Sequence, residues 1–97
     1  MKDYHVWYAR EFDPFCKSKI EPGLEKTHTF ISLVAAVDLD EVFSKMQGEV
    51  WSPNGEARKQ IEKAGTDHTS MSVGDIAVEK DTEKAFRCEN YGWAALN

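Results

Sequence analysis

The segment LVAAVDLDEVFSKM, residues 33–46, decides the fold, because it passes from a strand pattern to a helix pattern within a few residues. Its first five residues, 33–37, are all apolar, and such a run is typical of a central or well-covered strand. Asp38 is a good helix N-cap, and Glu41 three residues later completes a capping box. The segment therefore predicts a strand followed directly by a helix that begins after Asp38.

The predicted helix carries a single apolar stripe. Its members recur at positions i, i+3, i+4 and i+7, and they are Leu39, Val42, Phe43 and Met46. This spacing places them on one face, so we expect the stripe to lie in the core and Gly48 to end the helix. If Phe43 is fully buried there, its replacement by alanine costs about 3–5 kcal/mol.

Two strands are predicted before this helix. Residues 4–9 alternate between two faces, as β-branched and aromatic strand residues do. The first face carries Tyr4, Val6 and Tyr8, and the second carries His5 and Trp7. Residues 27–36 form the second strand. The stretch between them, at about 11–26, is charged and broken by two prolines, so it is predicted to be a long loop with either a functional or a mobile role.

A second helix is predicted from Pro53 to Ala64. Ser52 fits its N-cap, and Gly65 fits its C-terminal stop. The inward-facing residues of this helix are Ala57, Ile61 and Ala64.

The rest of the chain is predicted to be β-structure. Residues 75–79 and 85–89 are interpreted as a hairpin, and the aromatic tail at 91–96 packs down, with room for a short last strand. The order β-β-α-α-β-β predicts an α+β fold, a small antiparallel sheet with two helices packed on one face. With 97 residues, the chain 1–97 fits a single domain.

Composition excludes several classes of protein. Hydrophobic residues make up 41% and charged residues 30%, which is typical of a folded chain. The net charge of -5 argues against direct nucleic-acid binding, which normally needs a basic face. The longest apolar run has five residues and the N-terminus lacks a signal-peptide core, so we expect no membrane association and a cytoplasmic location.

The potential metal ligands are isolated in the sequence. His5, His28, His68 and the two cysteines, Cys16 and Cys88, show no paired spacing of the kind that zinc sites use. We therefore expect no metal and no other cofactor. Two distant cysteines in a chain without an export signal are also expected to be thiols, not a disulfide.

The segment HTSMSVGD, residues 68–75, is the first candidate site. Its residue types resemble a serine–histidine–aspartate triad in His68, Ser70 and Asp75, but it lacks the nucleophile elbow that such a serine needs. Two other interpretations stay open. In one, the polar side chains build a turn; in the other, they hold a small ligand such as a nucleotide phosphate together with backbone N–H groups. The binding residues in this hypothesis are His68, Thr69, Ser70, Ser72 and Asp75.

Trp51 defines a second candidate site between the two predicted helices. It either fills the gap where the helices meet or is an exposed anchor for a partner, since tryptophan and arginine are enriched in interface hot spots. Asn54 and Arg58 would belong to the same binding surface.

Two stretches of the chain resemble proteins from phages. Residues 48–58, GEVWSPNGEAR, together with residues 68–76, resemble small bacteriophage-encoded proteins. Residues 68–76 and the Tyr91-Gly92-Trp93 motif after a hairpin are similar to the YodL-like domains of phages and mobile elements. The resemblance covers roughly residues 38–96. It implies a phage or mobile-element origin and an accessory role, and it implies no catalytic residues. With a phage origin, the expected location is the cytoplasm of the host cell.

The sequence therefore leads to two main hypotheses about function. The first is a non-enzymatic phage accessory protein that binds a host or phage protein or other macromolecule, for example an inhibitor of a bacterial defence system. The alternative is a small-ligand or nucleotide-binding module that uses residues 68–75. A third hypothesis, an RNA-contacting sheet that stacks bases on Tyr4, Trp7 and Tyr8, agrees less well with a pI of 5.1. Eleven aromatic residues also leave a homodimer open.

Overall fold

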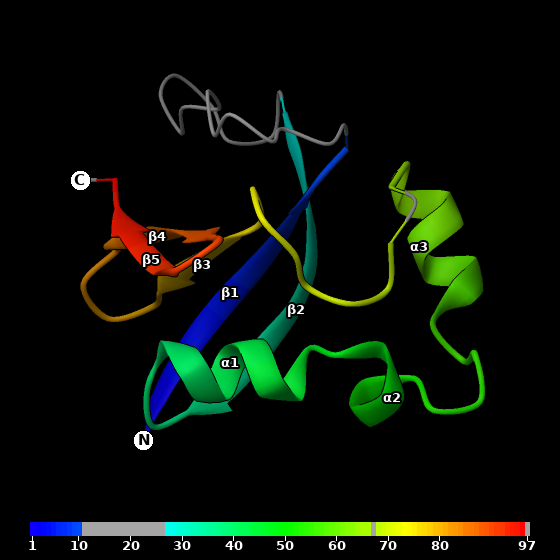
Figure 1. Ribbon diagram of the computed structural model, residues 1–97, viewed down its shortest axis with the longest axis horizontal. Coiled ribbons are helices and arrows are strands. Elements are labelled where there is room, and N and C mark those ends of the chain that lie inside the picture. The colour runs from blue at the N-terminus through cyan, green and yellow to red at the C-terminus, as the bar shows by residue number, and fades with distance from the viewer. Residues whose placement is uncertain (11–26, 67, 97) are drawn as a thin grey trace.

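The computed structural model describes residues 1–10, 27–66 and 68–96, so the predicted loop at 11–26 lies outside the described residues. Among the described residues there are five strands and three short helices (Figure 1). They are β1 (Lys2–Ala9), β2 (His28–Ala36), α1 (Leu39–Lys45), α2 (Gly48–Trp51), α3 (Arg58–Ala64), β3 (Ile76–Glu79), β4 (Ala85–Glu89) and β5 (Gly92–Ala95).

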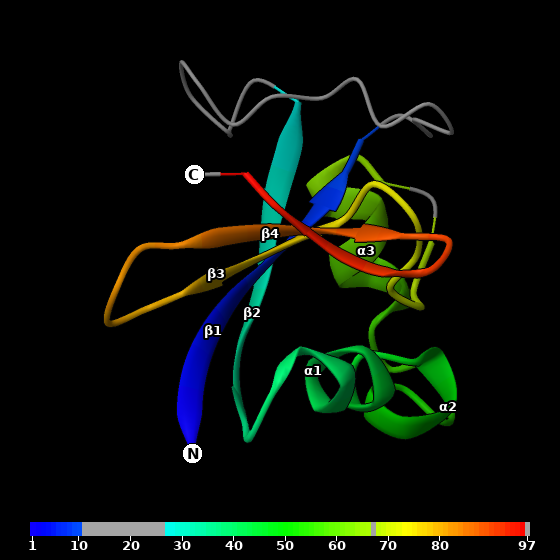
Figure 2. The same cartoon turned by 60° about the vertical axis from the view of Figure 1, so that its left-hand side comes forward.

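The five strands form one antiparallel sheet in the order β2-β1-β3-β4-β5 (Figure 2). The predicted α+β class and antiparallel sheet are confirmed. The predicted element order is only roughly right, because it lacks α2 and counts no final strand. The sequence did not indicate α2, because one turn of four residues is too short to give a periodic pattern. The predicted order did not count β5, which begins at Gly92 with a positive φ of 85°, a conformation typical of glycine in turns.

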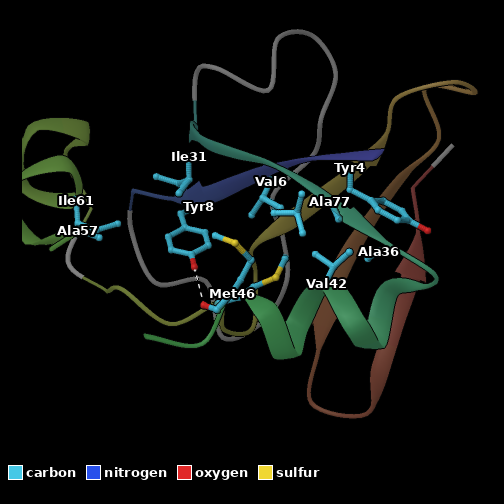
Figure 3. Close-up of a cluster of buried hydrophobic side chains, with 12 residues drawn as sticks. Tyr4, Val6, Tyr8, Ile31, Ala36, Val42, Met46, Ala57, Ile61 and Ala77 are labelled. Carbon is cyan, nitrogen blue, oxygen red and sulfur yellow. Dashed lines mark hydrogen bonds between the residues drawn. The ribbon is translucent and has the colours of Figure 1, made fainter. Parts of the chain in front are cut away.

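The core lies between the helices and one face of the sheet. Figure 3 shows Tyr4, Val6 and Tyr8 of β1 pointing toward α1, as their alternation predicts. Val42 from α1, Met46 at the C-cap of α1 and Ile61 from α3 join the same cluster, so these two helices cover the same face. The opposite face of the sheet, which we call the outer face, carries the alternate residues of β1, His5 and Trp7.

The helix α1 begins as predicted. The Asp38 carboxylate accepts a hydrogen bond from the Glu41 N–H at 2.9 Å, and the Glu41 carboxylate accepts one from the Val37 N–H at 3.2 Å. The end of the helix differs from the prediction. It stops at Lys45, with Met46 as C-cap, and Gly48 opens α2 instead of closing α1.

The apolar stripe of α1 is only partly buried. Val42 and Met46 are buried, and Leu39 packs against the core in part. Phe43 is 38% exposed, so the expectation that it lies fully in the core is wrong. A stripe of four residues is wider than the contact that one short helix makes with the sheet.

β2 is an edge strand, so the predicted central or well-covered position is wrong. Leu33 is 49% exposed, and Val37 just beyond the strand is 58% exposed. The pairing with β1 shifts between Val6 and Trp7, which leaves Ile31 as the extra residue of a β-bulge. Because of this bulge, Ile31 and Val34 both face the core although they are three residues apart.

The helix α3 starts later than predicted, at Arg58 instead of Pro53. The Ser52 hydroxyl accepts a hydrogen bond from the Ala57 N–H at 2.8 Å, so it caps the turns before the helix. The inward positions Ala57 and Ile61 are buried as predicted. Gly65 closes the helix in the left-handed conformation, with a φ of 81°, which confirms the predicted stop.

Candidate functional site

The segment 68–75 connects α3 with β3, and hydrogen bonds join it to other elements, among them β1 and α2. The Tyr8 hydroxyl donates to the Thr69 carbonyl at 2.8 Å, and the Trp51 indole N–H donates to the same carbonyl at 2.9 Å. The Ser70 hydroxyl accepts from the Gly48 N–H at 2.7 Å. These contacts hold the segment against β1 and α2, and they engage two of the predicted ligand-binding residues within the molecule.

Asp75 is the fully buried centre of this site. Its carboxylate accepts hydrogen bonds from the Ala9 N–H and the Ser72 N–H, each at 2.8 Å. It also lies 2.8 Å from Nε2 of His68. Because the β1–β3 ladder ends at Trp7 and Ile76, the carboxylate supplies the acceptor that a longer ladder would have given to Ala9. Asp75 therefore joins β1, the segment 68–75 and His68.

His68 lies flat against Tyr8. The two rings are stacked with centroids 4.6 Å apart and planes 17° from parallel, and 24% of the His68 side chain is exposed. Burial raises the pKa of the Tyr8 hydroxyl well above its ordinary value, and the charge of Asp75 raises this pKa further, while the hydrogen bond with Trp51 opposes the rise. Tyr8 is thus a neutral platform under the imidazole.

The geometry brings together two members of the suspected triad but not the third. A carboxylate that orients an imidazole is the arrangement of a general base. The hydroxyl near the other ring nitrogen, Nδ1, is that of Thr66, at 3.5 Å, and Thr66 is buried. Ser70 instead receives the Gly48 N–H. The pair of His68 and Asp75 therefore faces no accessible hydroxyl nucleophile among the described residues.

The second candidate site is divided between buried and exposed residues. Trp51 is half-buried, packs against the core and bonds to Thr69, which is the arrangement expected of a residue that fills the gap between helices. Asn54 is exposed, and its backbone and side-chain N–H groups donate to the Glu56 carboxylate. Arg58 is exposed at the start of α3. A binding role for Trp51, Asn54 and Arg58 stays a prediction.

Sequence reasoning missed an aromatic cluster on the outer face of the sheet. On the outer face, the Phe30 ring lies edge-on to both His5 and Trp7, with centroids 5.7 Å apart in each case. Phe30 is 44% exposed, and Leu33 on the same strand faces the same side, opposite His5 in the ladder. We call His5, Trp7, Phe30 and Leu33 the outer-face patch. The alternation of residues 4–9 predicted that His5 and Trp7 share one face. The alternation of β2 is interrupted by its bulge, so the sequence did not place Phe30 and Leu33 on that face.

The hypothesis of an RNA-stacking surface on Tyr4, Trp7 and Tyr8 is wrong in two of its three residues. Tyr4 and Tyr8 are buried on the core face, so neither ring is available for a base. Trp7 lies on the outer face.

Comparisons with known proteins supply no relative. No family model matches the chain, and no curated protein or solved structure shows a significant match to it. The resemblance to YodL-like domains and the phage origin therefore stay predictions.

Among the described residues, no group of three or more histidine, cysteine or acidic side chains is placed to hold a metal ion. The described part of the chain also contains no helix with the length and apolarity that crossing a membrane requires. Cys88 is buried, and Cys16 lies outside the described residues.

Proposed function

We propose that this chain is a non-enzymatic accessory protein of a phage or mobile element that binds a host or phage macromolecule, for example a component of a bacterial defence system. The observation that supports a binding role is the outer-face patch. Its four residues carry no carboxylate, lysine or arginine, and two of its large apolar members, Phe30 and Leu33, are 44% and 49% exposed. Contiguous exposed apolar residues of this kind mark interaction surfaces in soluble proteins.

The patch is also ordered before a partner arrives. The Phe30 ring is held between the rings of His5 and Trp7, and these three residues stand on neighbouring paired strands. A side chain that is already fixed loses little conformational entropy on binding. Rigid aromatic residues are accordingly common among the residues that dominate interface energies.

The contacts of residues 68–75 support a structural role for this segment over catalysis or nucleotide binding. Five of its backbone N–H groups donate within the protein, those of His68, Met71, Ser72, Gly74 and Asp75. A phosphate would need such groups free, and it would meet the negative charge of the buried Asp75 carboxylate. The nucleotide-binding alternative therefore has less support than macromolecule binding. Thermal shift with a nucleotide panel, including cyclic nucleotides, checks it, and we expect no stabilisation at millimolar ligand.

An affinity capture experiment tests the proposed function. The protein is used as bait in bacterial lysate at micromolar concentration, beside the double variant Phe30→Ser with Leu33→Ser. A matched control is Val50→Ser, because Val50 is exposed on α2, away from the sheet. We expect one specific partner to be retained by the wild type and by the control and to be lost from the double variant. Absence of any specific partner, or equal capture by the double variant, would overturn the proposal.

A further inference from the structure

The two edge strands of the sheet, β2 and β5, differ in whether side chains donate hydrogen bonds to their outward backbone carbonyls. At β2, the helices α1 and α3 and the residue that follows β1 supply side chains that donate hydrogen bonds to the carbonyls of the strand. Three carbonyls accept such a bond: His28 from Arg10 at 2.8 Å, Ile31 from Gln60 at 3.0 Å and Ala35 from Lys45 at 2.7 Å. Side chains that occupy edge groups hinder the addition of another strand. The β2 edge is therefore closed at three places.

Within residues 1–10, 27–66 and 68–96, no side chain closes the β5 edge in this way. The Leu96 N–H donates to the Ala85 carbonyl at 2.9 Å, and the alternation of an antiparallel ladder then turns Ala94 toward β4. The N–H and C=O groups of Trp93 and Ala95 consequently point away from the sheet. Within the described part of the chain, no side chain donates to either of these carbonyls. Both residues present a donor and an acceptor to any strand that approaches.

The sequence of this edge favours an approach between like chains. Residues 91–96, YGWAAL, carry no charge, although 30% of the chain is charged and its net charge is -5. Two copies can therefore meet here without placing like charges opposite each other. A lysine or proline, which commonly protects an edge strand, is absent from this stretch.

We infer that β5 is a strand-pairing site for the β5 strand of a second copy of this chain. Antiparallel pairing about a two-fold axis near Ala94 sets Trp93 of one copy opposite Ala95 of the other, so that a large side chain meets a small one. The outward N–H and C=O groups of both residues are then satisfied. The product is one continuous sheet, with five strands from each copy.

The size of the edge sets the strength of this dimer. β5 has four residues, and Tyr91 in the preceding turn, which is 99% exposed, adds contact area beside it. An interface of this extent falls below the range of stable dimers, so we expect reversible pairing with a Kd of roughly 0.1–1 mM.

Analytical ultracentrifugation tests the inference over protein concentrations from about 10 µM to 2 mM, a range that spans the expected Kd. Ala95→Pro removes an outward N–H and leaves the bonds to β4 intact, and Ala95→Lys places a charge at the pairing site. The matched control is Ala35→Lys, the same change at an exposed position of the β2 edge. We expect the wild type and the control to dimerise and both Ala95 variants to pair at least tenfold more weakly.

A second measurement needs no variant. In NMR spectra of the wild type, the amide shifts that depend on protein concentration should be confined to residues 91–96 and the facing β4 strand. A wild type that stays monomeric throughout, shifts that map elsewhere, or a dimer that survives in a folded Ala95 variant and is lost in Ala35→Lys would each overturn the inference.

Discussion

Asp75 shows how one side chain can join distant parts of a small protein. Its two oxygens accept from a strand N–H, a turn N–H and an imidazole, and no part of the carboxylate reaches solvent. A buried carboxylate is tolerated only when its hydrogen bonds are complete. The cluster of His68, Asp75 and Tyr8 is therefore explained first by the assembly of the fold.

Asp75→Asn should lower the free energy of unfolding by about 2–4 kcal/mol. The asparagine amide keeps one acceptor oxygen but replaces the other with a donor, so it faces either the Ala9 N–H or the Ser72 N–H with another N–H group. Urea unfolding measures the change. Asp81→Asn, in the exposed turn between β3 and β4, is the matched control and should stay within about 0.5 kcal/mol of the wild type. An equally small effect at Asp75 would contradict this account.

Tyr8 should make the protein sensitive to alkaline pH. Its folded pKa is raised, mainly by burial, so above pH ~10 the unfolded chain loses the phenolic proton while the folded protein keeps it. The folded state then binds more protons, and its stability falls as the pH rises, by about 1.4 kcal/mol per pH unit. Below pH ~10 the hydroxyl is neutral in both states and has no such effect.

Tyr8→Phe isolates this effect, because Tyr4, whose pKa burial also raises, and the lysines remain in the variant. Near neutral pH the variant should lose about 1 kcal/mol, since Trp51 still donates to the Thr69 carbonyl and Met71 to the Met46 carbonyl. Between pH ~10 and 11.5 the unfolding free energy should fall less steeply in the variant than in the wild type. Parallel slopes in urea titrations across this range would show that Tyr8 ionises equally in both states.

At the scale of the element, the apolar spacing of α1 predicts which residues share one face, whereas packing against the sheet decides which of them are buried. Met46→Ala should cost about 2–5 kcal/mol, because the side chain is buried, whereas Phe43→Ala should cost only about 1–2 kcal/mol, because its ring is 38% exposed. Chemical denaturation of both variants measures the order. A larger loss for Phe43→Ala would place its ring in the core after all.

Local signals predicted much of the fold. The capping box of Asp38 and Glu41, the left-handed Gly65 and the alternation of β1 each depend on a few neighbouring residues, and all three are present. The edge position of β2 was not predictable in this way, because its apolar run looks the same on a central strand. The bulge at Ile31 also hides the alternation that exposes Phe30 and Leu33.

The candidate site follows the same division. The sequence placed polar groups in residues 68–75 and predicted that they build a turn or bind a ligand. It did not indicate Tyr8 as their support, because the hydrogen bond between Tyr8 and Thr69 spans 61 residues. The bond between Ala9 and Asp75 spans 66 residues. Contacts across such separations arise from the strand order, which the sequence alone did not determine.

At the scale of the whole molecule, the sheet combines a closed edge, an open edge and an exposed aromatic patch. The patch lies on β1 and β2, and the open edge is β5, at the other end of the strand order. A partner on the outer-face patch and a second copy at β5 therefore occupy opposite ends of the sheet. The two events can be tested independently, with Phe30 and Leu33 variants for one and Ala95 variants for the other.

Opening the β2 edge should create a new self-association. In the double variant Lys45→Met with Gln60→Leu, the Ala35 and Ile31 carbonyls lose their side-chain donors. Of the three donors, only Arg10 at the His28 carbonyl then remains, so most of the uncharged edge strand that carries Phe30 and Leu33 is open, and such a strand is a template for pairing with another chain. The loss of the Glu41–Lys45 ion pair costs only about 0.3–0.5 kcal/mol, so the fold should persist.

Light scattering should show concentration-dependent oligomers that remain when Ala95→Pro is added. The control Lys59→Met, an exposed lysine of α3, removes the same charge and should leave the wild-type behaviour unchanged. Oligomers that disappear with Ala95→Pro would assign the association to β5, and an unchanged double variant would show that the side chains of Lys45 and Gln60 do not protect the β2 edge.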